Sequence, residues 1–207
     1  MSDYIPRGWY NRGYLPHCDN DSRPQMITYR LADSLPSDVA MELVERYPQE
    51  DERRVKFEEV LDRCYGSCVL RESSCAEIVI ENWKHHDGSK YRLLDWVVMP
   101  NHVHVTYDRP TVPMEEILHS WRSYTSNEIK KVTGAFGDDE PLWLYDYFDR
   151  FARDKYHLFN MQNYIFLNPV KAGLVNDPFD WAWSSIHEYG PLKESIARWW
   201  AGSKDRF

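Results

Sequence analysis

The chain has 207 residues and a formal net charge of −8, from 25 basic and 33 acidic side chains. Its length suits a single domain with a proper hydrophobic core, and the acidic balance argues against a protein that binds DNA regardless of sequence, because such binding depends on Lys and Arg neutralising phosphates. No run of about twenty apolar residues occurs and the first residues lack the basic-then-apolar order of a signal peptide, so we expect a cytoplasmic protein without membrane contact.

Residues 1–24 combine aromatic side chains with Gly, Pro, Asn and Asp and show no sustained hydrophobic period. This composition predicts an irregular N-terminal arm before the main domain, which we place at 25–190, with a C-terminal tail at 191–207. The basic residues Arg7 and Arg12 are interleaved with aromatic rings, a combination suited to contacts with nucleic-acid bases and backbone. An arm that only packs on the domain would explain the same residues.

The hydrophobic periods along the rest of the chain predict alternating strands and helices. The expected elements in chain order are a strand at 26–31, a helix at 37–47, a charged loop or helix face at 49–56, helices at 57–66 and 75–83, a hairpin of strands at 91–99 and 102–107, a helix at 114–132, an extended segment at 142–150 and a helix at 154–167. We expect the last helix to end near Asn168, because Pro169 disfavours helical geometry in the residue before it. This order, with no Gly-rich dinucleotide loop, predicts an α+β fold with helices on one face of an antiparallel sheet.

The most informative segment is 96–107, in which two β-branched runs are separated by Pro100 and Asn101. Proline and asparagine favour a tight turn, so the segment predicts a strand, a turn and a returning strand. Residues two apart on a strand share a face, so His102 and His104 project together. Two adjacent imidazoles on a rigid strand are half of a metal site, although a polar pair facing solvent would show the same pattern.

The other cysteines and histidines are weaker candidates for metal ligands. Cys64 and Cys68 are four apart on an expected helix, where buried reduced thiols explain them better than a structural zinc. His85 and His86 are adjacent in an expected turn and point in different directions, so we leave them out of the metal site.

A second segment, 164–173 with the sequence YIFLNPVKAG, follows the histidine pair by about sixty residues. Together with PNHVHV at 100–105, it resembles the REP-associated tyrosine transposases, relatives of the single-tyrosine, His-hydrophobe-His transposases of small insertion sequences. The resemblance covers nearly the whole chain, and the further matching segments, in the same order, are GYLPH at 13–17, RLADSLP at 30–36, YFDR at 147–150 and WAWSS at 181–185. It implies a ferredoxin-like core for the predicted α+β fold.

The second segment supplies the chemistry that the histidine pair lacks. Residues four apart on a helix share a face, so Tyr164 and Asn168 stand one turn apart. If that face lies over His102 and His104, the Asn168 amide oxygen completes a set of ligands that suits Mg²⁺ or Mn²⁺, with Mn²⁺ the better match to imidazole. Tyr164 is then the covalent nucleophile, since a phenolate with a pKa of about 10 is also a good leaving group and allows rejoining. Lys171, near the same face, is a candidate phosphate contact.

The resemblance also implies a substrate and a set of DNA contacts. The substrate is a single-stranded DNA hairpin of the repetitive extragenic palindrome (REP) type, cut to leave a 5′-phosphotyrosine on the enzyme and a free 3′-hydroxyl on the DNA. Contacts from the N-terminal region are implied by the family, and those from the helix at 114–132 and beyond by local positive charge. The proposed DNA-binding residues are Arg7, Trp9, Arg12, His17, Arg122, Lys130, Arg153 and Lys171. The residues leave open whether the protein is a monomer or a homodimer.

Other classes of protein share parts of this pattern. A histidine-triad nucleotide hydrolase needs three alternating histidines, but Thr106 occupies the third position. A rolling-circle initiator or relaxase has two histidines and a tyrosine, but in a different order or with further domains. A non-catalytic DNA-hairpin-binding regulator derived from such a transposase would keep the whole pattern, and the variant Tyr164→Phe separates it from an enzyme.

Overall fold

The computed structural model describes residues 4–11, 16–20, 22–137 and 139–192. Arg12 and the part of the predicted tail at 193–207 lie outside these residues. Within them, no helix is long and apolar enough to cross a membrane.

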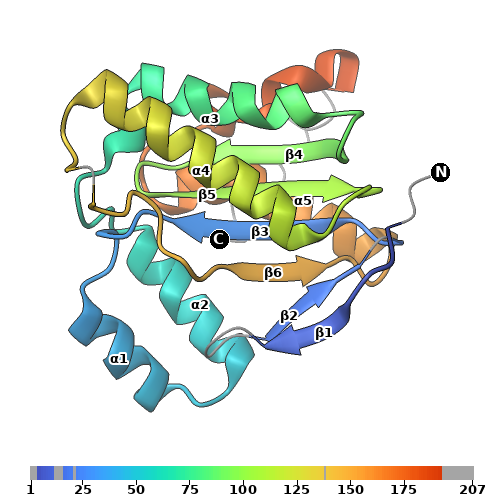
Figure 1. The fold of residues 1–207 in the computed structure, drawn as a ribbon, viewed down its shortest axis with the longest axis horizontal. Coiled ribbons are helices and arrows are strands. Elements are labelled where there is room, and N and C mark those ends of the chain that lie inside the picture. The colour runs from blue at the N-terminus through green and yellow to red at the C-terminus, as the bar shows by residue number, and fades with distance from the viewer. Residues whose placement is uncertain (1–3, 12–15, 21, 138, 193–207) are drawn as a thin grey trace.

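The centre of the fold is a four-stranded antiparallel sheet (Figure 1). Its strands, in spatial order, are β4 (Arg92–Val98), β5 (His102–Asp108), β3 (Gln25–Arg30) and β6 (Phe148–Phe151). The helix α3 (Ser73–His86) precedes β4 and α4 (Met114–Thr133) follows β5, which gives a β-α-β-β-α-β core in the chain order β3, α3, β4, β5, α4, β6. This is the ferredoxin-like arrangement, and the α+β prediction is confirmed.

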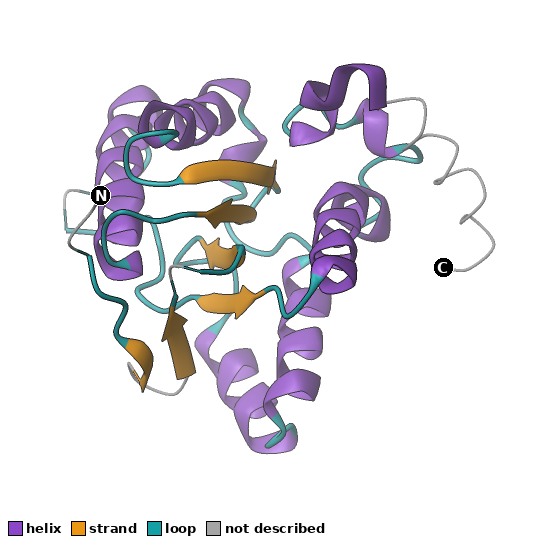
Figure 2. Ribbon diagram, turned by 90° about the vertical axis from the view of Figure 1, so that its right-hand side faces the viewer, coloured by secondary structure: helices purple, strands orange, loops and turns teal. Residues whose placement is uncertain are grey.

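Helices cover both faces of this sheet, as the edge-on view of Figure 2 shows. On one face, α3 and α4 pack against side chains such as Val103 and Val105 of β5. On the other face, α5 (Lys155–Lys171) packs against Met26 and Val97. The prediction of helices on a single face was therefore wrong. The alternating polar residues of β5 suggested a solvated face, but every residue of β5 is buried because α5 covers them.

Two helices between β3 and α3 extend the core. They are α1 (Ser37–Arg46) and α2 (Glu50–Leu61), which pack through a small apolar cluster that includes Leu43 and Phe57. The helix predicted at 57–66 corresponds to α2, which begins earlier and ends earlier than expected. It includes most of the charged stretch at 49–56. It stops at Leu61 because Cys64 and Gly66 adopt positive φ angles of 55° and 87°, which a right-handed helix does not accommodate.

The N-terminal segment is a two-stranded antiparallel hairpin of β1 (Gly8–Asn11) and β2 (Pro16–Asp19), not an irregular arm. One buried carboxylate on β6 fastens it to the sheet. Asp149 accepts hydrogen bonds from the backbone N–H of Cys18 at 3.0 Å and from Gln25 at 3.1 Å, and its other oxygen lies 2.6 Å from His17 Nδ1. These long-range pairs leave no periodic signal in the sequence, which is why the hairpin was missed.

The helix α5 continues through Pro169 to Lys171, beyond the end predicted at Asn168. Proline removes a single N–H donor and does so in the last turn, where the loss of one intrahelical bond is tolerated. The segment that follows α5 is held against β4 by two tryptophan residues. The indole N–H of Trp181 donates to the Val98 carbonyl at 3.0 Å, and the Val98 N–H donates to the Trp183 carbonyl at 2.9 Å. Short 3₁₀ turns, η2 (Pro178–Asp180) and η3 (Ser185–Leu192), complete this segment, and a third, η1 (Val69–Arg71), precedes α3.

Candidate active site

The two histidines of β5 lie side by side beneath α5. Their ring centroids are 4.9 Å apart and the rings meet edge to face. Both side chains are almost completely buried, and burial lowers the pKa of His102 to about 3, although the adjacent Asn168 amide opposes the shift. Burial likewise lowers the pKa of His104 well below its usual range. Both imidazoles are therefore neutral at physiological pH, the state in which imidazole binds a metal.

Hydrogen bonds with neighbouring side chains fix the orientation of the two imidazole rings. The Asn101 amide nitrogen donates to the carbonyls of Leu61 and Tyr65, so its amide oxygen faces His102 Nδ1 at 2.8 Å. Because an amide oxygen only accepts, His102 Nδ1 carries the proton and Nε2 is left as a lone pair. Thr28 Oγ1 lies 2.7 Å from His104 Nδ1 and holds the orientation of the second ring. From the sequence, Asn101 was only a turn former and Thr28 a strand residue.

The helix α5 brings Tyr164 and Asn168 over the histidines of the same chain. The Tyr164 ring stands edge-on to the His104 ring, with centroids 5.1 Å apart. Asn168 is fully buried one turn further along α5, and neither of its amide atoms reaches hydrogen-bond geometry with a partner. The structure thus gathers all four residues predicted for the nuclease site.

The donor atoms gathered here fit a divalent metal ion. His104 Nε2 and the Asn168 amide are buried without hydrogen-bond partners, a costly arrangement unless something else satisfies them. In the described part of the chain, no cluster of three His, Cys, Asp or Glu side chains could hold a metal. An ion at this site would therefore depend on the two imidazoles and the Asn168 amide oxygen, a set that suits Mn²⁺ or Mg²⁺ better than zinc.

Two carboxylates from α2 and its end also border the site, and sequence reasoning missed both. Asp62 Oδ1 lies 3.9 Å from His102 Nε2, and burial together with the Glu58 charge raises the pKa of Asp62 to about 7. Burial also raises the pKa of Glu58, whose carboxylate lies close enough to Tyr164 for the tyrosine to act on this pKa. The two lie four residues apart, so they share one helix face, but no motif in the sequence linked that face to Tyr164.

A basic cavity of about 480 Å³ opens beside Tyr164. Four cationic side chains line it, namely Arg54, Arg150, Arg153 and Lys171. Lys171 Nζ lies 4.9 Å from the centroid of the Tyr164 ring, and burial lowers the pKa of this lysine despite the opposing charges of Glu58 and Asp62. Local positive charge next to the tyrosine thus coexists with a net charge of −8 for the whole chain. Arg153 and Lys171, both predicted to bind DNA, lie here, whereas Arg54 and Arg150 were not predicted.

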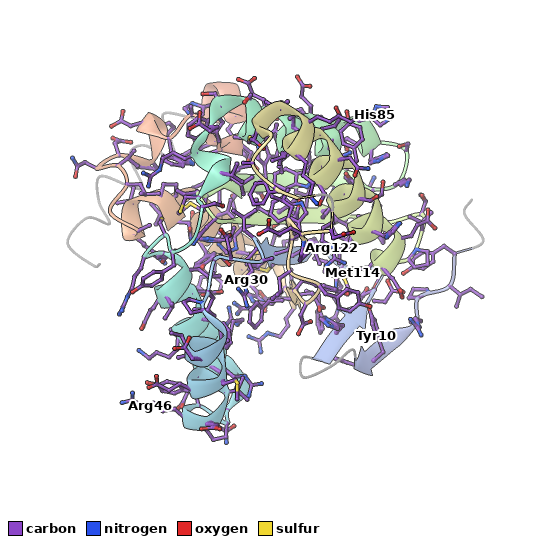
Figure 3. All side chains as sticks on the ribbon, turned by 60° about the vertical axis from the view of Figure 1, so that its left-hand side comes forward. Tyr10, Arg30, Arg46, His85, Met114 and Arg122 are labelled. Atoms are coloured by element: carbon purple, nitrogen blue, oxygen red, sulfur yellow. The ribbon has the colours of Figure 1, made fainter. Side chains whose placement is uncertain are left out.

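The two predicted DNA contacts on α4 lie on the other face of the sheet from α5. Arg122, labelled on α4 in Figure 3, donates to the carbonyls of Leu144 and Tyr145. Lys130 Nζ donates to the Gly137 carbonyl at 2.8 Å. Both side chains therefore hold the loop that follows α4, and the sheet separates them from Tyr164.

The predicted contacts in the N-terminal hairpin divide into exposed and buried residues. Trp9 is 69% exposed and Arg7 is exposed, with its guanidinium 3.2 Å from Glu115. His17, by contrast, is fully buried between the carboxylates of Asp146 and Asp149 and reaches no surface that DNA could contact. The DNA role predicted for His17 is therefore corrected, because its ring fastens the hairpin to the sheet.

Comparisons with known proteins agree with the resemblance found in the sequence. No family model matches the chain. A REP-associated tyrosine transposase of Escherichia coli (strain K12) is 32% identical over 93 residues, which are 44% of this chain and 52% of the relative. The chain thus spans about half the length of this curated relative, and the match confirms the predicted resemblance. A solved REP-associated tyrosine transposase bound to a REP hairpin is 17% identical with a TM-score of 0.48, over 86% of this chain and 82% of that chain.

Proposed function

We propose that this protein is a transposase-like enzyme that cuts and rejoins single-stranded DNA through a covalent 5′-phosphotyrosine at Tyr164. The observation that carries the proposal is the edge-on contact between Tyr164 on α5 and His104 on β5, within one chain. A tyrosine beside two neutral imidazoles and an unpaired buried amide has the parts needed for covalent catalysis on a phosphodiester. Because one chain supplies all four residues, a monomer would be sufficient.

The proposed substrate is a hairpin of the REP type, taken from the name of the curated relative and from the motifs at 100–105 and 164–173. The cavity lined by Arg54, Arg150 and Arg153 would hold the phosphates of the strand next to the scissile bond. Exposed Trp9 and Arg7 on the N-terminal hairpin are available for a second contact with the DNA. Because the proposed substrate is genomic DNA, the proposal includes a cytoplasmic location.

The residues of the site divide the work of strand cleavage. His102, His104 and Asn168 would hold a divalent ion, and such an ion supplies Lewis-acid polarisation of a phosphate oxygen. Asn101 keeps the Nε2 lone pair of His102 directed into the site, and Thr28 holds the ring orientation of His104. Tyr164 Oη attacks phosphorus and displaces the 3′-oxygen of the neighbouring nucleotide, which leaves the 5′-phosphate on the tyrosine. Attack by a 3′-hydroxyl on this phosphotyrosine reverses the step, so rejoining needs no nucleotide cofactor.

The test is a cleavage assay resolved under denaturing conditions. The protein is incubated with labelled single-stranded REP-type hairpins and with Mn²⁺, Mg²⁺ or EDTA, alongside Tyr164→Phe and His102→Ala. We expect a denaturation-resistant protein–DNA band that depends on metal and is absent from both variants. Hairpin binding in native gels without any covalent band, across hairpins and metals, would reject the enzyme and favour a non-catalytic hairpin-binding regulator.

A further inference from the structure

One face of α5 forms a wall of the basic cavity beside Tyr164. Tyr156, Asn160, Tyr164 and Lys171 all line this cavity. Their spacing follows the helical repeat, so a single face leads from the first turn of α5 to the proposed nucleophile. Tyr156 and Tyr164 are eight residues apart, which is about 12 Å along a helix axis. A strand whose phosphodiester lies at Tyr164 therefore has neighbouring nucleotides within reach of Tyr156.

The residues that line the cavity divide by charge. The cations Arg54, Arg150 and Arg153 come from α2, from β6 and from the segment between β6 and α5. The first two turns of α5 add the uncharged side chains of Tyr156 and Asn160. Cations bind phosphates, whereas an aromatic ring stacks on a base and a carboxamide hydrogen-bonds to its edge. The cavity thus offers phosphate contacts and base contacts together.

The Tyr156 side chain is 75% exposed. Among the residues that the structure describes, it has no partner in a hydrogen bond, an ion pair or a ring contact, so it contributes little to the fold. Single exposed aromatic residues are common and need no ligand, but this ring lies at a basic cavity with an amide one turn further along the helix. Stacking on an unpaired base also needs no positive charge, which suits a chain with a net charge of −8.

His157, which also lines the cavity, supplies an independent observation. Burial and the charges of Arg150 and Arg153 lower its pKa, so the ring is neutral, and its Nδ1 accepts the Arg153 backbone N–H at 3.1 Å. The proton is therefore on Nε2, and this donor is buried without a hydrogen-bond partner. The acidic Asp154 cannot serve it, because its carboxylate accepts the His157 backbone N–H at 2.7 Å and caps α5. A phosphate oxygen of a bound strand is an acceptor that would satisfy Nε2, next to Tyr156.

We propose that Tyr156 and Asn160 form a reading site for one unpaired base near the scissile phosphate, with Tyr156 stacking on the base and Asn160 hydrogen-bonding to its edge. The proposal rests on the function proposed above and deepens it, because it assigns the choice of cleavage position to α5. A carboxamide presents a donor and an acceptor side by side, which match N6 and N7 of adenine, so adenine is the expected base. The phosphates that flank this base would lie against Arg150 and Arg153.

The experiment selects tight binders from a pool of REP-type hairpins whose unpaired flanks are randomised, in EDTA so that no strand is cut. Wild-type protein should enrich adenine at one flank position. The selected hairpin, and copies with another base or an abasic site at that position, are then titrated by fluorescence anisotropy against wild type, Tyr156→Ala, Asn160→Leu and Tyr124→Ala. Tyr124 is the matched control, because it is a 52% exposed tyrosine on α4, across the sheet from the cavity.

We expect Tyr156→Ala to weaken hairpin binding about 5- to 150-fold, the range for one stacked base. The slope of log K against log salt should stay unchanged, since no phosphate contact is lost. An abasic site should weaken wild-type binding by a similar factor and have little further effect in Tyr156→Ala. Asn160→Leu should bind adenine and the other bases equally at that position, and Tyr124→Ala should match wild type.

Other outcomes would overturn the reading site. Losses from Tyr156→Ala and from the abasic site that multiply would show that the ring and the base do not meet. A smaller salt slope in Tyr156→Ala, a base preference kept by Asn160→Leu, or a wild-type selection that enriches no flank base would also contradict it. The proposed function is tested separately by the covalent band with Mn²⁺. A missing band with an intact base preference would reject the enzyme and leave the reading site to a hairpin-binding protein.

Discussion

The ring of Tyr164 meets the ring of His104 edge to face, at 84° and with centroids 5.1 Å apart, although sixty residues separate them in the chain. The contact requires α5 to cross the face of the sheet that β5 lines with His102, His104 and Thr106. The opposite face of β5 carries Val103 and Val105, which pack under α3 and α4. One strand thereby serves a core on one side and a candidate site on the other.

The hydrogen bond between Thr28 and His104 gives the first prediction. Thr28→Val keeps the shape of the side chain and removes the hydroxyl that orients His104 Nδ1. We expect the affinity for Mn²⁺, measured by isothermal titration calorimetry, to fall about 10- to 100-fold, the usual effect of losing a partner that orients a metal ligand. Thr106→Val is the control, because the Thr106 hydroxyl is buried on β5, the strand that carries His104, and has no hydrogen-bond partner. Equal affinity in the two variants would show that Thr28 does not orient the ligand.

Asn168 gives the second prediction, in which stability and function change in opposite directions. Its amide is fully buried without a hydrogen bond, so Asn168→Leu removes an unsatisfied polar group at similar volume. We expect the free energy of unfolding in EDTA to rise by about 1 kcal/mol in urea titrations. Added Mn²⁺ should stabilise the wild-type protein more than the variant, since the variant keeps the two imidazoles but lacks the amide oxygen as a ligand. A variant less stable than wild type in EDTA would mean that packing around the amide, rather than a ligand, explains its presence.

The four central residues of the candidate site could be predicted from the sequence because local periodicity fixes them. The alternation of a strand places His102 and His104 on one face, and the helical repeat places Tyr164 and Asn168 on another. The motif resemblance then supplied the pairing of these two faces. Periodic signals likewise predicted most of the strands and helices of the core, and the resemblance supplied its ferredoxin-like arrangement.

The residues that support the site could not be predicted, because they come from segments with no periodic or motif signal toward it. Glu58 belongs to a charged stretch that looks like a solvated helix face, and it is the fold of α2 against α5 that buries it beside Tyr164. Arg54 and Arg150 likewise reach the basic cavity from elements far apart in the sequence. Conversely, the sequence suggested that the positive charge on α4 forms a DNA-binding surface. In the structure, Arg122 and Lys130 instead donate to loop carbonyls on the other side of the sheet.

The third prediction distinguishes two possible DNA-binding surfaces, the cavity beside Tyr164 and the outer face of α4. Arg153 lines the cavity beside Tyr164, whereas Lys130 lies on α4 across the sheet. We expect Arg153→Gln to weaken hairpin binding, measured by fluorescence anisotropy, and to reduce the slope of log K against log salt by about 0.7, the value for one phosphate contact on a single strand. Lys130→Gln should leave both quantities unchanged. An equal loss in Lys130→Gln would place the DNA across α4, as the sequence first suggested.

The buried His17 gives the last prediction, which concerns stability against pH. Burial alone would lower the pKa of His17, but hydrogen bonds and charges from Asp146 and Asp149 outweigh it and raise this pKa to about 9. The folded pKa lies above the unfolded value of about 6.5, so the charged pair stabilises the fold fully below pH 6.5 and loses this contribution as the pH rises through 9. His17→Gln should therefore cost most at low pH, about 3–5 kcal/mol as for a buried pair that loses one partner, and clearly less at pH 10. Urea titrations of both proteins at pH 6, 8 and 10 measure this difference, and a cost independent of pH would mean that His17 is held as a neutral hydrogen-bonded ring.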